Sequence, residues 1–306
     1  MRSPFFYGKG CWVFFLFLCV AACKKNPSPV RNTITPLQTL INTDTTLSLF
    51  HRMVLQANDA GLIGNDSVTV LIPTNAAFRS AGYSETVIDS ISTTFSDNLI
   101  RYHFLLSRVI PDGNTYTGYA TQQGHTIYGM TDTTHIRWFN GTAVTGDSTM
   151  AGNVLVYRLS APLTYPADSL DILLGSDSTL TFMAEVLQRT NLDSVLFSGN
   201  LTLLAPTNSA FINAGYDSVG AIDAVDSSTL VQLVKYHTLT ADWFTNTLMG
   251  LTTVSTLQGG SLTVGKQNGV LQFSGTGNAS PANFLSGNQL AGSTLIVHRI
   301  DQVLSP

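Results

Sequence analysis

Two groups of polar residues in this chain of 306 residues have side chains suited to binding or proton transfer, and each group occurs twice. The first is a proline, a threonine and an asparagine after an apolar run: Pro73, Thr74 and Asn75, then Pro206, Thr207 and Asn208. Their hydroxyl and amide groups could form a binding loop. The same residue types also cap free backbone groups where a strand turns into a helix. The sequence favours this structural interpretation.

The second group is a tyrosine followed by a histidine: Tyr102 and His103, then Tyr236 and His237. A histidine that titrates near neutral pH could serve as a general base or a metal ligand. His103 lies four residues after Leu99, and His237 lies four residues after Leu233. Each histidine therefore shares a helix face with apolar residues. We favour a buried, hydrogen-bonded histidine in each helix over a ligand or a base.

The sequence contains no other pattern that would indicate catalysis. Only two of the nineteen acidic residues are glutamate, Glu85 and Glu185, and neither belongs to a repeated carboxylate pair suited to glycoside hydrolysis. Gly-x-Ser-x-Gly, His-Glu-x-x-His and phosphate-binding glycine loops do not occur. His125 and His135 are better explained as surface histidines than as a metal site. We expect no enzyme activity, no cofactor and no bound metal.

Both groups recur because the chain contains a duplicated domain. Residues 68–78 are repeated, with conservative changes, as residues 201–211. This period is far longer than the roughly 20–50 residues of solenoid repeats, so it indicates tandem domains. The sequence predicts domain 1 over residues 37–165 and domain 2 over residues 169–305. The linker over residues 163–168 is too short for free tumbling, so we expect a constrained tandem.

Helices are expected early in each domain and strands late. The predicted helices cover residues 47–54, 97–106, 180–187 and 227–237, and two more begin at Ala76 and Ser209. The predicted strands cover residues 68–72, 126–128, 135–139, 154–157, 201–205, 261–264, 270–273 and 293–297. This order predicts an α+β fold, with a β-sandwich or barrel-like sheet flanked by helices in each domain.

Residues 1–22 have the layout of a secretory signal peptide. A basic start is followed by an apolar run and then by small residues. Val20-Ala-Ala-Cys23 resembles the lipobox of bacterial lipoproteins, which implies cleavage before Cys23 and lipid on its thiol and its new amine. Two such lipid signals suffice for stable membrane anchoring. An ordinary signal peptide with a chance cysteine is the alternative. Residues 23–36 are polar and rich in proline, so we expect an extended tether.

The composition limits the partners. Of three cysteines, two lie in the apolar run of the signal and the third is Cys23, so no disulfide is expected in either domain. Without residues 1–22 the chain keeps 13 basic and 19 acidic residues. This acidic balance argues against nucleic acid as a partner. The expected partners are the membrane, through lipid on Cys23, and an unidentified protein or glycan.

Aspartate is followed directly by serine or threonine more often than the composition predicts. Ten such pairs occur, among them Asp66-Ser67, Asp89-Ser90 and Asp193-Ser194. Most resemble a three-residue acceptor for O-glycosylation in exported proteins of Bacteroidetes. Asx turns and helix caps explain the same pairs equally well, because Asp and Ser are apt residues for both. The sequence leaves the two interpretations open.

Three motifs, in the same order in both domains, resemble those of the fasciclin domain family. The two strand-to-helix segments resemble its first motif, and the tyrosine–histidine pairs resemble its central motif. Residues 297–304 resemble its closing motif and include His298 and Asp301. Domain 1 lacks both residues in the corresponding segment, 156–163, which puts any role of that motif in doubt there. The resemblance extends from about Leu37 to Leu304.

The resemblance implies a β-sandwich with a helical flank, found in extracellular adhesion and matrix-associated proteins. With the lipobox, the chain resembles surface lipoproteins of Bacteroidetes-type bacteria, some of which accompany glycan-uptake systems. We expect a lipid-anchored protein of the cell envelope, at the outer membrane, that holds a protein or glycan through its paired domains. A structural or accessory subunit of an outer-membrane complex is the alternative. Exposure of four aromatic residues would favour glycan stacking, and their burial would favour the structural alternative: Trp138, Phe139, Trp243 and Phe244.

Overall fold

The structure, a computed structural model, describes residues 34–306 apart from 59–68, 198 and 293. The expected signal peptide, Cys23 and most of the tether lie outside these residues. Thr35–Pro306 forms one compact unit that contains both copies of the repeat. No helix in the described part of the chain is long and apolar enough to span a bilayer.

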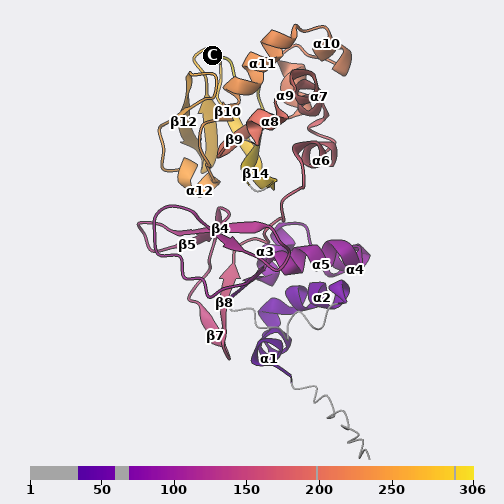
Figure 1. The fold of residues 1–306 in the computed structure, drawn as a ribbon, viewed down its shortest axis with the longest axis vertical. Helices are drawn as coiled ribbons and strands as arrows, with labels where there is room; N and C mark the ends of the chain where they lie inside the picture. The colour runs from indigo at the N-terminus through magenta and orange to yellow at the C-terminus, as the bar shows by residue number, and fades with distance from the viewer. Residues whose placement is uncertain (1–33, 59–68, 198, 293) are drawn as a thin grey trace, which may run out of the picture. The chain divides into compact units, whose positions relative to one another are not determined.

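Domain 1 begins with helices and ends with strands, as the sequence predicts (Figure 1). Its helical part comprises α1 (Pro36–Thr43), the short 3₁₀ turn η1 (Thr45–Leu47), α2 (Ser48–Ala57), β1 (Thr69–Pro73), α3 (Asn75–Ser80), α4 (Glu85–Ser90) and α5 (Thr93–Tyr102). Its strand part comprises β2 (Phe104–Leu105), β3 (Thr117–Ala120), β4 (Thr126–Thr131), β5 (Arg137–Phe139), β6 (Thr142–Ala143), β7 (Thr149–Ala151) and β8 (Val154–Leu159).

Domain 2 repeats this order. Its helical part comprises α6 (Leu170–Gly175), α7 (Thr181–Thr190), α8 (Asp193–Leu196), β9 (Leu201–Pro206), α9 (Asn208–Asn213), α10 (Val219–Asp223) and α11 (Ser227–Tyr236). The rest comprises β10 (Thr238–Leu239), α12 (Thr245–Leu248), β11 (Thr253–Ser255), β12 (Ser261–Gln267), β13 (Val270–Ser274), β14 (Ala282–Ala291) and β15 (Leu295–Ile300). The predicted α+β class, with a barrel-like sheet and helices in each domain, is confirmed.

The first and the last long strand of each domain lie side by side and run parallel. β1 pairs with β8 from Thr69–Leu155 to Pro73–Leu159, and β9 pairs with β15 from Leu201–Leu295 to Pro206–Ile300. The strand orders are β2-β1-β8-β7 in domain 1 and β10-β9-β15-β14-β13-β12-β11 in domain 2. A separate sheet, β3-β4-β5-β6, completes domain 1.

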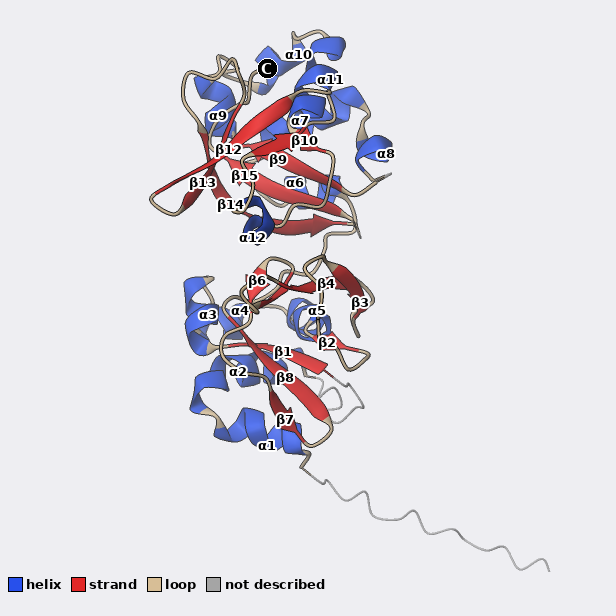
Figure 2. Ribbon diagram, turned by 90° about the vertical axis from the view of Figure 1, so that its left-hand side faces the viewer, coloured by secondary structure: helices blue, strands red, loops and turns tan. Residues whose placement is uncertain are grey.

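Each central strand is buried on both faces, because helices cover one face and strands the other (Figure 2). In β1, Val70 and Ile72 pack into the helical core, whereas Leu71 packs into the strand core. This alternation follows from the two-residue period of a strand. It explains why the sequence shows a continuous apolar run at β1 instead of alternating polar residues.

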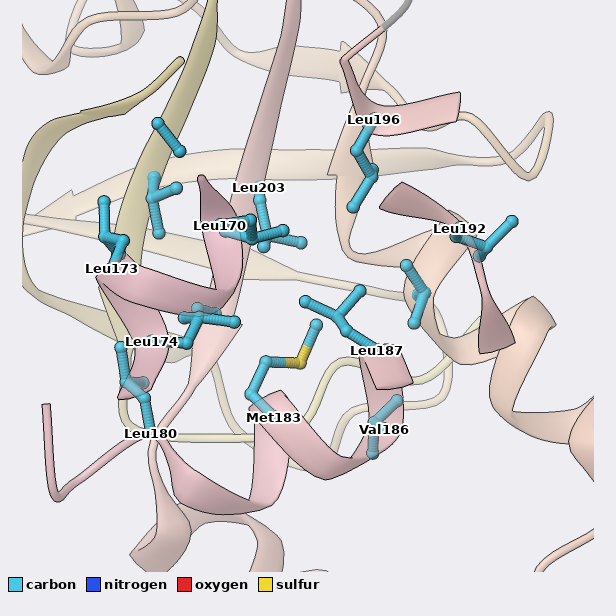
Figure 3. Close-up of a cluster of buried hydrophobic side chains, with 14 of the residues drawn as sticks. Leu170, Leu173, Leu174, Leu180, Met183, Val186, Leu187, Leu192, Leu196 and Leu203 are labelled. Carbon is cyan, nitrogen blue, oxygen red and sulfur yellow. The ribbon is translucent and has the colours of Figure 1, made fainter. Parts of the chain in front are cut away.

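The helical core of domain 2 is built almost entirely from aliphatic side chains. Leu174 of α6, Met183 and Leu187 of α7, and Leu203 of β9 point toward one another (Figure 3). The side chains at 183 and 187 meet the core together because residues four apart share one face of a helix. Full burial of such a side chain contributes roughly 1.5–3 kcal/mol to stability.

The first helix begins slightly before the predicted domain boundary. Thr35 and Pro36, which the sequence assigns to the end of the tether, form the start of α1. Thr35 accepts from the Gln38 N–H, and the Gln38 side chain accepts from the Thr35 N–H, which is a capping box. Proline fits the first turn because its missing N–H would have no partner there.

The helix predicted over residues 97–106 was placed too far along the chain. The observed helix α5 ends at Tyr102, and Phe104–Leu105 forms strand β2, which pairs antiparallel with Thr69–Val70 of β1. The apolar spacing continues through this segment, so the local pattern favours a helix. Hydrogen bonding to a strand more than thirty residues away outweighs this local preference for a helix.

The two domains contact each other through an aromatic cluster. The rings of Tyr116 in domain 1 and Phe244 in domain 2 lie 4.5 Å apart between centroids. The Tyr116 hydroxyl donates to Asn246 Oδ1 (2.6 Å) and accepts from the Gly141 N–H (3.2 Å). Phe244 is fully buried. This cluster couples the domains, in agreement with the short linker.

The linker also pairs with domain 2. The Ala167 N–H donates to the Leu290 carbonyl (3.0 Å), and the Gly292 N–H donates to the Ala167 carbonyl (2.8 Å). Ala167 thereby occupies the edge of β14 as one additional bridge residue.

We predict that Tyr116→Ala uncouples the two domains. The substitution removes the ring packed on Phe244 and both hydrogen bonds of the hydroxyl, a loss of about 2–4 kcal/mol. Calorimetry should show one unfolding transition for the original chain and two for the variant. Tyr119→Ala, at a partly buried tyrosine in strand β3 just after Tyr116, is the control. Two transitions already present in the original chain would contradict the prediction.

Candidate functional site

The repeated threonines cap helices. The Ala77 N–H donates to Thr74 Oγ1 (3.2 Å) at the start of α3, and the Ala210 N–H donates to Thr207 Oγ1 (3.3 Å) at the start of α9. Both helices begin at the asparagine, one residue earlier than the sequence indicates. The hydroxyl of each threonine therefore satisfies a free N–H group of the first turn.

The repeated asparagines join two helix starts. Asn75 Oδ1 accepts from the Leu49 N–H (2.9 Å), and Asn75 Nδ2 donates to the Thr45 carbonyl (2.8 Å) and the Ser48 hydroxyl (3.0 Å). In domain 2, Asn208 makes the same three bonds, to the Phe182 N–H, the Ser178 carbonyl and the Thr181 hydroxyl. Each amide fixes α2 to α3, or α7 to α9, and leaves little capacity for a ligand.

The tyrosine–histidine pairs are buried at the helix ends. The Tyr102 hydroxyl donates to the Thr126 carbonyl (3.0 Å) and accepts from Asn140 Nδ2 (2.8 Å). Tyr236 is also buried. Both tyrosines bind residues of the strand part, so they link the helices to it.

His103 and His237 each bridge two backbone groups. His103 Nδ1 lies 2.7 Å from the Leu99 carbonyl oxygen, and His103 Nε2 accepts from the Leu163 N–H (3.0 Å). His237 does the same with Leu233 (2.8 Å) and Leu304 (2.8 Å). A carbonyl only accepts and a backbone N–H only donates, so each ring carries its proton on Nδ1. Through these two bonds, each neutral ring links the chain just after the last strand to a helix, α5 in domain 1 and α11 in domain 2.

His298 bridges backbone groups with the opposite tautomer. Its Nε2 lies 2.6 Å from the Trp243 carbonyl oxygen, and its Nδ1 accepts from the Asn288 N–H (3.1 Å). The proton is therefore on Nε2. A Cβ at Gly287 would lie 2.0 Å from Nδ1, so only glycine permits this close approach.

Domain 1 has no histidine at this position, but it keeps the hydrogen bond from a buried side chain to the loop carbonyl. Tyr157 occupies the corresponding place in β8, and its hydroxyl donates to the Val109 carbonyl (3.0 Å). Val109 and Trp243 are equivalent, because their N–H groups donate to Thr69 and Thr202 at matching places in the central strands. The phenol thus replaces the imidazole as a buried donor to the same loop.

Asp301 also binds its own domain. Its Oδ1 accepts from the Asn283 N–H (2.6 Å), and its Oδ2 accepts from Asn283 Nδ2 (2.7 Å). All the candidate polar side chains of the three motifs thus have partners within the protein. Burial lowers the pKa of His103, His237 and His298 to about 4, so none of the three is suited to general base catalysis near neutral pH.

The four aromatic residues whose exposure would favour glycan binding are mostly enclosed. Phe139 and Phe244 are fully buried, and Trp138 and Trp243 are partly buried. Trp138 Nε1 donates to Asp132 Oδ2 (2.8 Å). This burial favours a structural role for these four side chains.

The other two candidate histidines lie outside any cluster of potential metal ligands in the described part of the chain. His125 lies 3.6 Å from Asp168, and His135 is exposed on a turn. Within the described ranges, no group of three or more His, Cys, Asp or Glu is arranged to hold a metal ion.

Several Asp-Ser and Asp-Thr pairs form Asx turns. At Asp44, Asp132, Asp177 and Asp226, the carboxylate accepts from the N–H and the hydroxyl of the residue two positions later. Ser169 and Ser218 cap helices. The turn interpretation therefore accounts for these six of the ten pairs, and Asp66-Ser67 lies outside the described residues.

A repeated ion pair, which the sequence analysis missed, holds the last strand. Arg158 of β8 binds Asp44 (2.7 Å), and Arg299 of β15 binds Asp177 (2.5 Å). The arginines and the aspartates occupy matching positions of the two repeats, which was the available signal. Both pairs are partly exposed, with 20–29% of each side chain accessible to solvent.

Arg299 of the second ion pair lines two cavities. One cavity, of about 770 Å³, is lined by Thr179, Ser209, Asn213, Arg299, Asp301 and Gln302, together with apolar residues that include Leu285. The other, of about 540 Å³, is lined by Phe95, Tyr165, Ile172, Asp177, Gln289 and Arg299. Because Arg299 lines both, we call the two cavities together the Arg299 groove. No local pattern in the sequence indicates these cavities, because their walls come from distant segments.

The sequence matches the model of the fasciclin domain twice, over residues 45–166 and again over residues 178–306. The chain belongs to the fasciclin domain family. Each match includes one copy of the threonine–asparagine caps, the buried histidine and the last strand.

Relatives with this domain come from animals and bacteria. Transforming growth factor-beta-induced protein ig-h3 of Sus scrofa is 23% identical over 256 residues, which cover 79% of this chain and 35% of that protein. Human periostin is 26% identical over 160 residues, or 51% of this chain and 18% of periostin. Immunogenic protein MPT70 of Mycobacterium tuberculosis is 32% identical over 128 residues, or 42% of this chain and 61% of that protein.

Among solved structures, a FAS1 domain pair from the insect cell adhesion molecule Fasciclin I is similar. It shares 14% sequence identity with a TM-score of 0.41, over 85% of this chain and 96% of that one. The chain spans about a third of ig-h3 and less than a fifth of periostin.

We predict that Asn208→Ala lowers the stability of domain 2. The change removes three hydrogen bonds and leaves the Phe182 N–H without its partner, so the free energy of unfolding should fall by about 2–4 kcal/mol. Urea unfolding measures it. Asn213→Ala, at the exposed end of the same helix, is the control. Equal effects of the two substitutions would contradict the structural role of Asn208.

We also predict that mild acid destabilises the fasciclin domains. The pKa of each of the three buried histidines is about 4 in the folded chain, against an ordinary value of 6.5. The unfolded chain therefore binds more protons in this range, and stability is lost as the pH falls from about 6.5 toward 4. Between pH 7 and pH 5 the expected loss is roughly 2 kcal/mol for each histidine.

Urea unfolding at several pH values tests this dependence. His135→Asn is the control, because His135 is exposed, and it should leave the pH dependence unchanged. A free energy of unfolding that stays constant from pH 7 to pH 5 would show that the three rings are not held neutral by burial.

Proposed function

We propose that this protein is a lipid-anchored protein of the cell envelope whose two fasciclin domains bind a ligand and carry out no catalysis. The proposal rests on the partners that the motif side chains bind. The asparagine amides, the buried histidines and the Asp301 carboxylate all bind groups of the protein itself. Such side chains build a scaffold, and the exposed surface and cavities are left for recognition.

The proposed anchor is Cys23. Its position after Val20-Ala-Ala, at the end of an apolar run, is that of a lipidated cysteine. The polar residues between Cys23 and helix α1 then serve as the tether. In this proposal, lipid on Cys23 holds both domains at a membrane surface, that of the outer membrane. The fasciclin relatives and the resemblance described above support an adhesive role there.

The coupling of the domains supports binding by the pair as a unit. The Tyr116–Phe244 contact and the Ala167 bridge hold the domains in one arrangement. A ligand that touches both domains therefore meets a preorganised surface and loses less conformational entropy of the protein on binding.

A second candidate is a structural or accessory subunit of an outer-membrane complex. The burial of Phe139 and Phe244 favours it, because these aromatic rings stabilise the fold and the domain contact and are not available to a ligand.

We predict that Cys23→Ser releases the protein from the membrane. Without the thiol the lipid cannot be attached, so the protein should move from the detergent-soluble membrane fraction to the aqueous fraction. Cys19→Ser, within the apolar run of the signal, is the matched control and should leave the protein in the membrane. Detergent phase separation measures both. Retention of Cys23→Ser in the membrane fraction would contradict the anchor.

Treatment of intact cells with an impermeant protease tests the position of the domains. The adhesive role predicts that the protease cuts the protein on intact cells. Cleavage only after lysis would contradict the adhesive role and favour the accessory subunit.

A further inference from the structure

We infer that the Arg299 groove binds a linear, uncharged oligosaccharide, which rests on the proposed function as a binding protein. Each cavity falls within the range of about 300–1,000 Å³ that is ordinary for ligand pockets. Arg299 lines both, so we place one part of the oligosaccharide in each cavity, with Arg299 in contact with both parts.

The smaller cavity is lined by aromatic and aliphatic side chains. The rings of Phe95 and Tyr165 lie 5.8 Å apart with a tilt of 58°, and both are partly buried. Ile172, in the same lining, is 56% exposed. Aromatic side chains are large apolar surfaces with a polar edge, so we assign the C–H face of a sugar ring to this lining.

The two cavities also have planar polar groups whose charges largely cancel. The guanidinium of Arg299 is paired with Asp177, and the Gln289 amide lies beside the pair in the same cavity. Asp301 in the other cavity adds a second carboxylate, so the lining has a small excess of negative charge. Planar donors and acceptors match neighbouring hydroxyl groups, whereas the negative excess disfavours an acidic glycan.

The larger cavity offers exposed hydroxyl and amide groups. Ser209 and Asn213 lie on the outer face of helix α9 and line the larger cavity. Ala76 and Ser80 occupy the corresponding positions of α3 in domain 1, and Ala161 replaces Gln302. Domain 1 keeps a hydroxyl at Ser80 but lacks the polar groups of Ser209 and Gln302, so we expect one site for each chain.

An extended peptide fits the groove less well. Peptides bind beside a sheet by adding a strand to an open edge. The end of the β14 edge beside the smaller cavity is already occupied, because the Leu290 carbonyl and the Gly292 N–H bond to Ala167 of the linker. A peptide could not form backbone bonds at these two positions without displacing the linker.

Calorimetric titration of the full mature chain, in a detergent without sugar head groups, tests the inference. The probes are cellohexaose, laminarihexaose, mannohexaose and xylohexaose. We expect at least one to bind with a stoichiometry of one and a dissociation constant of about 1 mM or tighter.

Two pairs of variants locate the site. Arg299→Gln should weaken binding at least about tenfold, because it removes a charged donor from the groove. Arg158→Gln removes the matching ion pair in domain 1 and should leave affinity unchanged. Ile172→Glu should also weaken binding, whereas Ile212→Glu, equally exposed but outside both cavities, should not.

Three results would overturn the inference. The first is that none of the four hexasaccharides binds. The second is that Arg158→Gln weakens binding as much as Arg299→Gln. This would show that loss of either ion pair acts through the general stability of the protein. The third is that a pool of random peptides binds in an Arg299-dependent manner and the sugars do not. Membrane release of Cys23→Ser is measured independently, so an anchored protein that fails here overturns only the groove.

Discussion

The rest of each domain depends on the parallel pairing of its first and last long strands. Parallel neighbours require a crossover connection, and here nearly the whole domain forms that connection. The helices α2 to α5 cover one face of the pair, and the later strands cover the other. The fold therefore requires that the last strand stays paired with the first. The arginine–aspartate ion pair binds a side chain of the last strand, and the buried histidine binds the chain just after that strand ends.

A comparison of the two repeats shows which hydrogen bonds around the paired strands tolerate a change of residue. His298 and Tyr157 differ in size and chemistry, yet both donate to the loop that Thr69 or Thr202 also holds. The bond to the loop carbonyl is therefore retained, while the residue that makes it has changed. Because the polar groups are buried, leaving one of them without a partner costs about 1–3 kcal/mol, which explains why a donor is present in both domains.

Local features of the sequence predicted much of this structure. Thr74 and Thr207 follow apolar strands, so their role as caps could be inferred from neighbouring residues alone. The burial of His103 followed from its helical spacing. Phe104–Leu105 was predicted as helix because its strand partner is distant in sequence. The Tyr116–Phe244 contact and the Arg299 groove join segments that no local pattern relates, so neither could be predicted.

The protonation state of the buried histidines tests the central claim, that the motif residues bind groups of the protein itself and so close the fold. Nitrogen-15 NMR of the imidazole rings at neutral pH reports it directly. The account predicts three neutral rings with fixed tautomers, the proton on Nδ1 of His103 and His237 and on Nε2 of His298. Rings that are protonated, or that exchange between tautomers, would contradict it, because such rings could not hold the backbone groups on both sides.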